Sequence, residues 1–305
     1  MGGRTEPDGN AVWENATMTI ELAVDCRNQL GEGPVWDVQE QALYWVDIAG
    51  RMLQRHQHAT GMTQRWMMPE RIASFALRRS SGMVLALETG FAFFEPLTEE
   101  LRWISRPEVM TRHNRFNDGK CDSSGRFWAG TMDDRAAEHT GSLYRLDSDL
   151  TVHRMDDGIG ISNSLAWSPD DSTFYFADTL DGRIYAYDFD APSGAISRKR
   201  PFVSVNGPGV PDGSAVDSEG YLWNAEWNGW RIVRYAPDGS VDRVIALPVQ
   251  KPTSCAFGGP DLRTLYVTSA AWDLAQSDLA AQPWAGGVLA IEVDVGGLPA
   301  PRFGG

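Results

Sequence analysis

Six stretches of this chain resemble one another and recur at a nearly constant interval. Their first residues are separated by 41, 44, 46, 49 and 41 positions. An interval of this length is typical of a β-propeller, in which each repeat forms one four-stranded blade. The sequence therefore predicts an all-β fold, a six-bladed β-propeller. The six stretches are EGPVWD (Glu32–Asp37), ASFALR (Ala73–Arg78), NDGKCD (Asn117–Asp122), NSLAWS (Asn163–Ser168), DGSAVD (Asp212–Asp217) and TSCAFG (Thr253–Gly258).

Short apolar and aromatic strands alternate with turn residues inside each repeat. The clearest examples are Ser168–Asp190 and Asp217–Ser240, where Pro-Asp-Asp and Asp-Gly turns separate aromatic-rich strands. Helical periodicity is weak, and one helical turn is expected around Trp272–Ala281. The sixth repeat lacks an outer strand, while the apolar stretch Met18–Asp25 belongs to no repeat. We predict that this N-terminal strand pairs with the last blade and closes the ring.

All six repeats fit one domain, residues 18–305, because propellers keep such lengths in a single unit. We expect residues 1–17, and the tail after Gly296, to be loosely ordered. No apolar signal-peptide core and no run of transmembrane length is present, so a cytoplasmic location is expected. A monomer or weak homo-oligomer is the expected assembly.

Charge and cysteine content exclude several classes of function. With 27 basic and 41 acidic residues the formal charge is −14, which argues against nucleic acid or an anionic membrane as a partner. Three widely spaced cysteines form neither a disulfide framework nor a CxxC metal motif. We expect Cys121 and Cys255, which share a repeat position, to be buried free thiols. The nucleophile, zinc-protease and phosphate-loop motifs G-x-S-x-G, HExxH and G-x-x-x-x-G-K are also absent.

In a propeller, equivalent positions of every blade face the same central axis. The first residues of the six stretches include the hard oxygen ligands Glu32, Asn163 and Asp212, a set that suits a divalent cation with open coordination positions. Separately, Glu32 could be solvated in a loop, Asn163 could cap a loop and Asp212 could belong to a turn. Their shared repeat position favours a metal site. Ala73 and Thr253 supply no strong ligand at this level.

Three further polar residues lie near this column of repeat positions. Asn117 shares the column and is either a fourth ligand, through water, or a substrate contact. Arg115 lies two residues earlier, where it can reach the same cavity or pair with an acid in a structural role. For Asp178, in FYFADT, we favour a hydrogen bond at the end of a strand.

These residues lie in segments that resemble the senescence-marker-protein/gluconolactonase family of sugar lactonases, also called the regucalcin family. The segments are LGEGPVWD, NRFNDGKCDSSGRFWAGTM, GISNSLAWSPDD with FYFADTL, and VPDGSAVDSEGYLW, in order over residues 30–223. The resemblance implies a six-bladed propeller and hydrolysis of aldonolactones. It also implies one divalent ion, among Ca, Zn, Mn, Mg and Fe, held by Glu32, Asn163 and Asp212. Arg115 and Asn117 would then contact the sugar.

One departure from the family pattern bears on selectivity. Some members continue the GTM motif with acidic residues, the last of which helps to bind the substrate. Here Gly130–Met132 is followed by two aspartates and Arg135, which occupies the position of that acid. Pentonolactones and gluconolactone both stay open as substrates.

We therefore predict metal-dependent hydrolysis of a sugar lactone to its aldonic acid. Asp212 is the candidate general base, and a metal-bound hydroxide is the alternative. Two competing hypotheses use the same residues. One is a propeller phosphotriesterase or arylesterase, and the other is a non-enzymatic calcium-binding protein.

Overall fold

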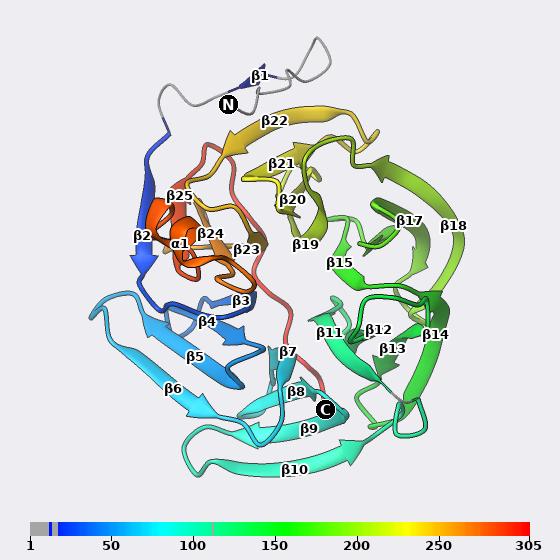
Figure 1. Cartoon of the computed structure of the whole chain (residues 1–305). Helices are drawn as coiled ribbons and strands as arrows, with labels where there is room; N and C mark the ends of the chain where they lie inside the picture. The colour runs from blue at the N-terminus through cyan, green and yellow to red at the C-terminus, as the bar shows by residue number, and fades with distance from the viewer. Residues whose placement is uncertain (1–11, 14–17, 112) are drawn as a thin grey trace.

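The chain forms a ring of six antiparallel β-sheets around a central axis (Figure 1). The computed structural model describes residues 12–13, 18–111 and 113–305. Each sheet holds four strands, and one carries a short fifth strand. The predicted six-bladed β-propeller is therefore confirmed.

Five of the sheets are built from consecutive strands, each running from an inner strand near the axis to an outer strand at the rim (Figure 1). The first two sheets contain β3 (Gly31–Asp37), β4 (Ala42–Asp47), β5 (Met52–Gln57), β6 (Thr63–Met67), then β7 (Ile72–Leu77), β8 (Met83–Leu87), β9 (Gly90–Glu95) and β10 (Glu100–Ser105). The third and fourth contain β11 (Asn114–Cys121), β12 (Phe127–Asp133), β13 (Gly141–Leu146), β14 (Val152–Ile159), then β15 (Ser162–Trp167), β16 (Thr173–Asp178), β17 (Arg183–Asp190) and β18 (Ala195–Ser204). The fifth contains β19 (Val210–Val216), β20 (Leu222–Trp227), β21 (Arg231–Tyr235) and β22 (Val241–Ala246).

The sixth sheet combines two distant parts of the chain. Its outermost strand is β2 (Ile20–Val24), which pairs antiparallel with β25 (Val288–Glu292). The inner strands of this sheet are β24 (Thr264–Ser269) and β23 (Pro252–Gly258). The pairing predicted between the N-terminal strand and the last repeat is thus present.

Part of the N-terminal segment is also described. Of residues 1–17, the strand β1 (Val12–Trp13) lies parallel to β22 and extends the fifth sheet. Residues 1–11 and 14–17 lie outside the described residues, and so does most of the segment predicted to be loosely ordered.

The hydrophobic core is divided among the interfaces between sheets. Among the described residues, buried apolar side chains form six clusters, and each cluster joins two neighbouring sheets. For example, Trp128 from the third sheet packs against Trp167 and Phe174 from the fourth. Burial of these large aromatic rings stabilises the contact between the third and fourth sheets. The predicted thiols Cys121 and Cys255 are buried and free within such clusters.

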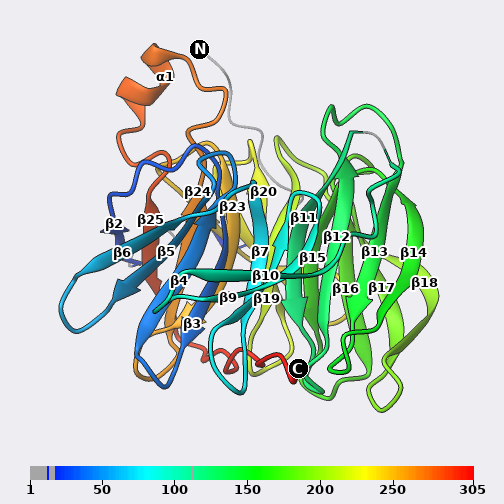
Figure 2. The same cartoon turned by 90° about the horizontal axis from the view of Figure 1, so that it is seen from below.

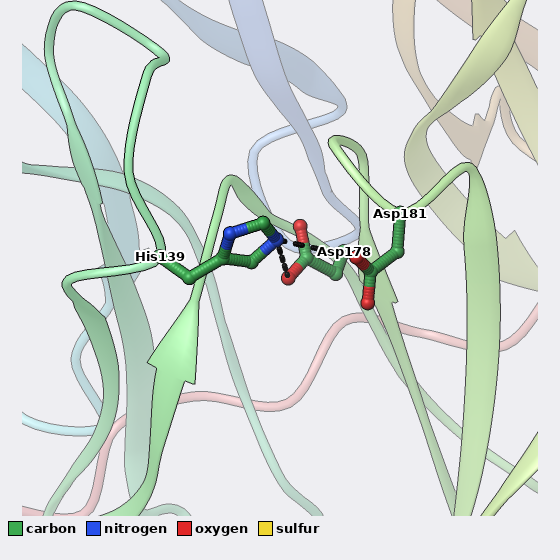
Figure 3. Close-up of side chains that lie close together, drawn as sticks. All are labelled: His139, Asp178 and Asp181. Atoms are coloured by element: carbon green, nitrogen blue, oxygen red, sulfur yellow. Dashed lines mark hydrogen bonds and ion pairs between the residues drawn. The ribbon is translucent and has the colours of Figure 1, made fainter.

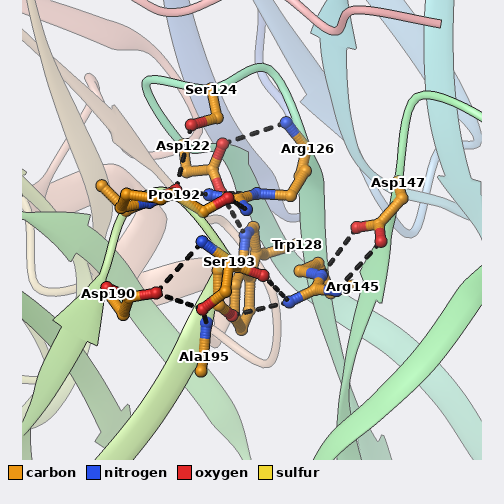
Figure 4. A network of polar contacts seen from close by, with 12 residues as sticks. Asp122, Ser124, Arg126, Trp128, Arg145, Asp147, Asp190, Pro192, Ser193 and Ala195 are labelled. Atoms are coloured by element: carbon orange, nitrogen blue, oxygen red, sulfur yellow. Dashed lines mark hydrogen bonds and ion pairs between the residues drawn. The ribbon is translucent and has the colours of Figure 1, made fainter.

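A buried aspartate follows the inner strand in two of the sheets. Asp122 accepts the indole N–H of Trp128 at 2.9 Å, and Asp217 accepts that of Trp223 at 2.8 Å. Each aspartate also pairs with a buried arginine. In the third sheet this arginine, Arg126, donates to the carbonyl of Ala191 at 2.6 Å and so ties the sheet to the β17–β18 turn of the fourth (Figure 4).

All six inner strands contain one residue more than their partner strand at the same level. Each register shift falls at the predicted column position or directly beside it. In β15, for example, Asn163 pairs with Ala177 and Ala166 pairs with Tyr175. Three residues of advance along β15 therefore correspond to two along β16. Such a β-bulge bends the strand and redirects side chains. The repeat column is therefore also a line of bulges around the axis.

The two faces of the ring carry different chain segments (Figure 2). A short helix, α1 (Gln276–Ala281), lies on the face where the inner strands begin, as the expected helical turn. None of the described helices is long and apolar enough to cross a membrane. The chain after β25 runs along the opposite face, where the inner strands end.

The prediction of a loosely ordered tail after Gly296 is wrong. Phe303 is fully buried in the cluster between the second and third sheets. Its backbone N–H donates to Leu77 at 2.8 Å, and its carbonyl accepts from Arg79 at 2.9 Å. Arg302 donates to Asp37 at 2.7 Å. The tail thus spans the face of the ring and attaches to sheets that lie far away in sequence.

Candidate active site

The predicted metal ligands lie at the start of three inner strands. Glu32 belongs to β3, Asn163 to β15 and Asp212 to β19. All three are buried, with exposed fractions of 6%, 3% and 5%. They come from blades one, four and five, so only the closed ring places them at one level of the central channel.

The carboxyl groups of Glu32 and Asp212 interact directly. Burial raises the pKa of Glu32 to about 8, and the nearby charge of Asp118 acts in the same direction. Burial also raises the pKa of Asp212 well above its usual range, and the charges of Glu32 and Asp118 add to this effect. Among the described residues, no Lys or Arg forms an ion pair with either carboxylate. Two buried carboxylates at close range without a cation form a costly arrangement.

A third acid at this level was missed from the sequence. Asp118 is 7% exposed and follows Asn117 directly in β11. Burial raises the pKa of Asp118, while the charge of Lys120 opposes the shift. Lys120 donates to the carbonyl of Ser214 at 2.7 Å, and its charge acts on the carboxylate of Asp118. The only available signal was its place next to a column residue.

The backbone takes an unusual conformation directly after two of the proposed ligands. Ser164 follows Asn163 in the bulge of β15 with φ 61°, and Gly33 follows Glu32 with φ 53°. The left-handed conformation is unfavourable for a serine. It is held in place because the Ser164 hydroxyl donates to the carbonyl of Asp212.

Arg115 and Asn117 lie beside these acids, as predicted. Arg115 is 7% exposed and uses three of its five N–H groups within the protein. Its Nε donates to Asp134 at 2.7 Å, and its Nη1 donates to the carbonyl of Phe116 at 2.9 Å and to Asn117 Oδ1 at 2.8 Å. Among the described residues, Nη2 has no hydrogen-bond partner. Nη2 is therefore the edge of the guanidinium that is free to bind a ligand.

Asp134, which sequence reasoning also missed, is shared by two arginines. Besides Arg115, it accepts two hydrogen bonds from Arg71, at 2.9 and 3.1 Å. Arg71 in turn forms a second paired contact with Glu88, at 2.8 and 2.9 Å. The charges here balance, with the two guanidinium groups of Arg71 and Arg115 facing the two carboxylates of Asp134 and Glu88. Such bidentate pairs fix the plane of a guanidinium.

The amide side chains connect blades three, four and five. Asn117 Nδ2 donates to Asn163 Oδ1 at 3.1 Å and to the carbonyl of Ser162 at 3.0 Å. Asn163 Nδ2 donates to Thr179 Oγ1 at 2.9 Å. Thr179 donates to the carbonyl of Pro211 at 2.7 Å. Both N–H groups of Asn117 are thus engaged by protein groups, whereas the side-chain oxygens of Asn117 and Asn163 each accept one hydrogen bond and keep a second lone pair.

A separate cluster of His139, Asp178 and Asp181 could be mistaken for a metal centre (Figure 3). His139 Nε2 lies 3.2 Å from Asp181 Oδ1 and 3.9 Å from Asp178 Oδ2. Asp178, however, ends β16 and accepts backbone N–H groups of residues 160, 161 and 180. Asp47 makes the same three contacts at the end of β4 in the first sheet. The predicted role of Asp178 at a strand end is therefore confirmed.

Arg135 is held by neighbouring acids. Its Nε donates to Asp133 at 3.0 Å, and Nη2 lies 3.6 Å from Glu138. The side chain is about half exposed, at 52%. Position 135 therefore offers no carboxylate of the kind that helps to bind the substrate in some members of the family.

The residues present fit a divalent cation. Two buried carboxylates and one amide oxygen are a hard donor set, and a cation would neutralise the repulsion between Glu32 and Asp212. The shell is incomplete with three protein donors, which leaves positions for water or substrate. The donor types do not distinguish among calcium, magnesium, manganese, zinc and iron.

Comparisons with known proteins gave consistent matches. A family model described as SMP-30/Gluconolactonase/LRE-like region matches residues 30–271. The chain is 42% identical to an L-arabinolactonase of Azospirillum brasilense, over 93% of this chain and 95% of that protein. It is 38% identical to a 6-deoxy-6-sulfogluconolactonase of Pseudomonas putida, over 94% and 99% of the two chains. A solved structure of a calcium-binding protein, regucalcin, from Agrobacterium tumefaciens matches with a TM-score of 0.90 and 30% identity, covering 94% of this chain and 97% of that one.

Proposed function

The chain belongs to the SMP-30/gluconolactonase/LRE-like family, and we propose that it hydrolyses a sugar lactone to the corresponding aldonic acid. The enzyme is a carboxylic ester hydrolase. The observation that carries the proposal is the group of buried oxygen donors Glu32, Asn163 and Asp212 beside an arginine with a free edge.

The chemistry divides between a bound ion and the protein. A divalent ion, when held by Glu32, Asn163 and Asp212, supplies Lewis-acid stabilisation of the negative charge that develops on the lactone carbonyl oxygen. Arg115 Nη2 donates to an oxygen of the sugar and so orients the ring. Asp212 accepts the proton of the attacking water.

Opening of the lactone ring then completes the reaction. The C–O bond of the ring breaks, and the departing alkoxide takes a proton to become the hydroxyl of the aldonic acid. Asp212, protonated in the first step, can return that proton. The burial of the acids keeps bulk water from screening these charges.

Metal removal and return test the proposal directly. The purified protein would be stripped with a chelator, reloaded with single ions, and assayed by acid release on pentono- and hexonolactones. The relatives justify including L-arabinonolactone and a gluconolactone that carries a sulfonate at carbon six. We expect activity only with a bound ion. Hydrolysis that is unaffected by complete metal removal would contradict the proposal.

Two other functions use the same residues and are separated by the same assay. A phosphotriesterase or arylesterase would act faster on organophosphates or aryl esters than on any aldonolactone. A non-enzymatic calcium-binding protein is suggested by the name of the Agrobacterium structure. It would bind calcium without lactone hydrolysis, and it would have no use for the free edge of Arg115.

A further inference from the structure

Thr179 contacts two parts of the proposed metal site, although it is uncharged and lies outside the repeat column. It follows the end of β16 and is half-buried. Its hydroxyl accepts from Asn163 Nδ2 at 2.9 Å and donates to the carbonyl of Pro211 at 2.7 Å. Pro211 directly precedes Asp212 in β19. One hydroxyl therefore links the side chain of one proposed ligand to the backbone of another.

The hydrogen bonds that reach Thr179 run in one direction only. The chain begins at the guanidinium of Arg115, which can only donate, and passes through Asn117 and Asn163 to Thr179. It ends at the carbonyl of Pro211, which can only accept. Because the first group can only donate and the last can only accept, each group between them must accept a hydrogen bond from the group before it and donate one to the group after it. The orientation of both amides is thereby determined.

This direction matters for metal binding. A neutral carboxamide coordinates a hard cation through its oxygen and not through its nitrogen. An asparagine amide turned by 180° about its last bond would present Nδ2 in place of Oδ1. In the observed arrangement, Thr179 takes the nitrogen of Asn163 and leaves the oxygen for a ligand.

We propose that Thr179 is a positioning residue for the metal site, which holds the Asn163 oxygen and the Asp212 backbone in the arrangement that binds the ion. The inference rests on the proposed function, because it assumes that Asn163 and Asp212 are ligands. Removing a group that orients a metal ligand typically lowers metal affinity about 10–100-fold.

A merely structural role predicts a different result. If Thr179 serves only to join blades four and five, its loss lowers stability and leaves the ion affinity of the folded protein unchanged. Thr179→Val keeps the shape of the side chain and removes both hydrogen bonds. Thr179→Ser keeps the hydroxyl and provides the conservative rescue.

Thr131 offers a matched control in blade three. Its side chain is fully buried, and its hydroxyl donates to Glu108 at 2.9 Å and accepts from the backbone of Ser142 at 2.8 Å. Thr131→Val therefore also removes buried hydrogen bonds, including a longer one to the carbonyl of Ser142 at 3.3 Å, but none of them reaches a proposed ligand. It should lower stability without changing ion affinity.

The experiment is calorimetric titration of Mn²⁺ into metal-free wild type and the three variants, far below their melting temperatures. We expect Thr179→Val to bind about tenfold more weakly or worse, and Thr179→Ser and Thr131→Val to bind like wild type. Wild-type affinity in folded Thr179→Val would overturn the inference and leave the proposed function intact. Failure of the wild type itself to bind any divalent ion would overturn both.

Discussion

Two buried aspartates on the fifth blade, five positions apart, have opposite surroundings. Asp217, at the end of β19, is fully buried and accepts hydrogen bonds from Arg234 at 2.7 and 2.9 Å and from Trp223 at 2.8 Å. Asp212, near the start of the same strand, is 5% exposed and faces other acids. Two carboxylates of similar burial thus differ in their partners: Asp217 is paired with a cation, and Asp212 faces other acids.

The same contrast recurs on the third blade. Asp122, after β11, pairs with Arg126 at 2.6 Å, whereas Asp118 within β11 lies near the other acids of the channel. A paired carboxylate is satisfied by the fold itself. A group of unpaired carboxylates has a cost that a retained proton or a bound cation can offset. Comparing the partners of buried acids therefore separates the functional end of the ring from its structural end.

The largest expected effect comes from Asp212→Asn. The substitution removes the proposed base and one charge from the ligand set, so lactone turnover should fall by about 10²–10⁴-fold. The free energy of unfolding of the metal-free protein should stay the same or increase, because a buried carboxyl group without a cationic partner is replaced by a neutral amide. Turnover and urea unfolding of the same preparation test this. Near wild-type turnover in folded, metal-loaded protein would contradict it.

The matched change at the other end is Asp217→Asn. It breaks a buried ion pair with Arg234 and should lower the free energy of unfolding by about 3–5 kcal/mol. Turnover per folded molecule should stay close to wild type, because the site lies at the opposite end of the strand. Loss of turnover without loss of stability would contradict the structural role that the comparison assigns to Asp217.

The acids of the site also predict how stability depends on pH. Without metal, Glu32 has a pKa of about 8 in the folded chain, against an ordinary value of 4.5. Between these values the folded chain holds a proton that the unfolded chain has released. The free energy of unfolding should therefore decrease as the pH rises from 4.5 to about 8.

A bound ion should reverse this trend, because it binds the ionised carboxylates. At a free concentration about 100-fold above Kd, it adds about 2.7 kcal/mol to the free energy of unfolding. Urea unfolding across this pH range, with and without Mn²⁺, measures both effects. Metal-free stability that rises with pH through the range would show that these acids are not raised in pKa.

The smallest effect tests a paired carboxylate at the functional end. Asp134→Asn weakens the contact that fixes the Arg115 guanidinium, so KM for the lactone should rise about tenfold with a smaller change in kcat. Asp294→Asn is the control, because Asp294 is 70% exposed and pairs with Arg243 on the surface. An unchanged KM in Asp134→Asn would contradict the prediction that Asp134 positions Arg115 for the substrate.

Much of the fold could be predicted from local patterns in the sequence. The six repeats, the unassigned strand before Cys26 and the helical turn near Gln276 all follow from short-range periodicity and turn residues. The tail after Gly296 was predicted wrongly, because the prediction rested on the general tendency of chain termini to be loosely ordered. Its order depends on the burial of Phe303 in a distant cluster, which local composition does not reveal.

The site was predicted in part for the same reason. The repeat column pointed to Glu32, Asn163 and Asp212, and their role as ligands stays a prediction. Asp118 escaped notice because regular alternation turns adjacent side chains to opposite sides, whereas the bulge in β11 breaks that alternation. Thr179 escaped because its partners lie 16 and 32 positions away on other strands.

The composition of the sixth sheet has a consequence for how the chain is made. Ile20 and Ile291 are paired across β2 and β25, so the sheet cannot be completed until the ribosome has produced nearly all of the chain. Until then, the apolar faces of blades one and five that border this sheet lack their partner. Incomplete chains therefore expose apolar surface during synthesis, and either chaperones or other incomplete chains can bind to it. Completion of the sixth sheet is therefore the step at which the newly made chain buries this apolar surface.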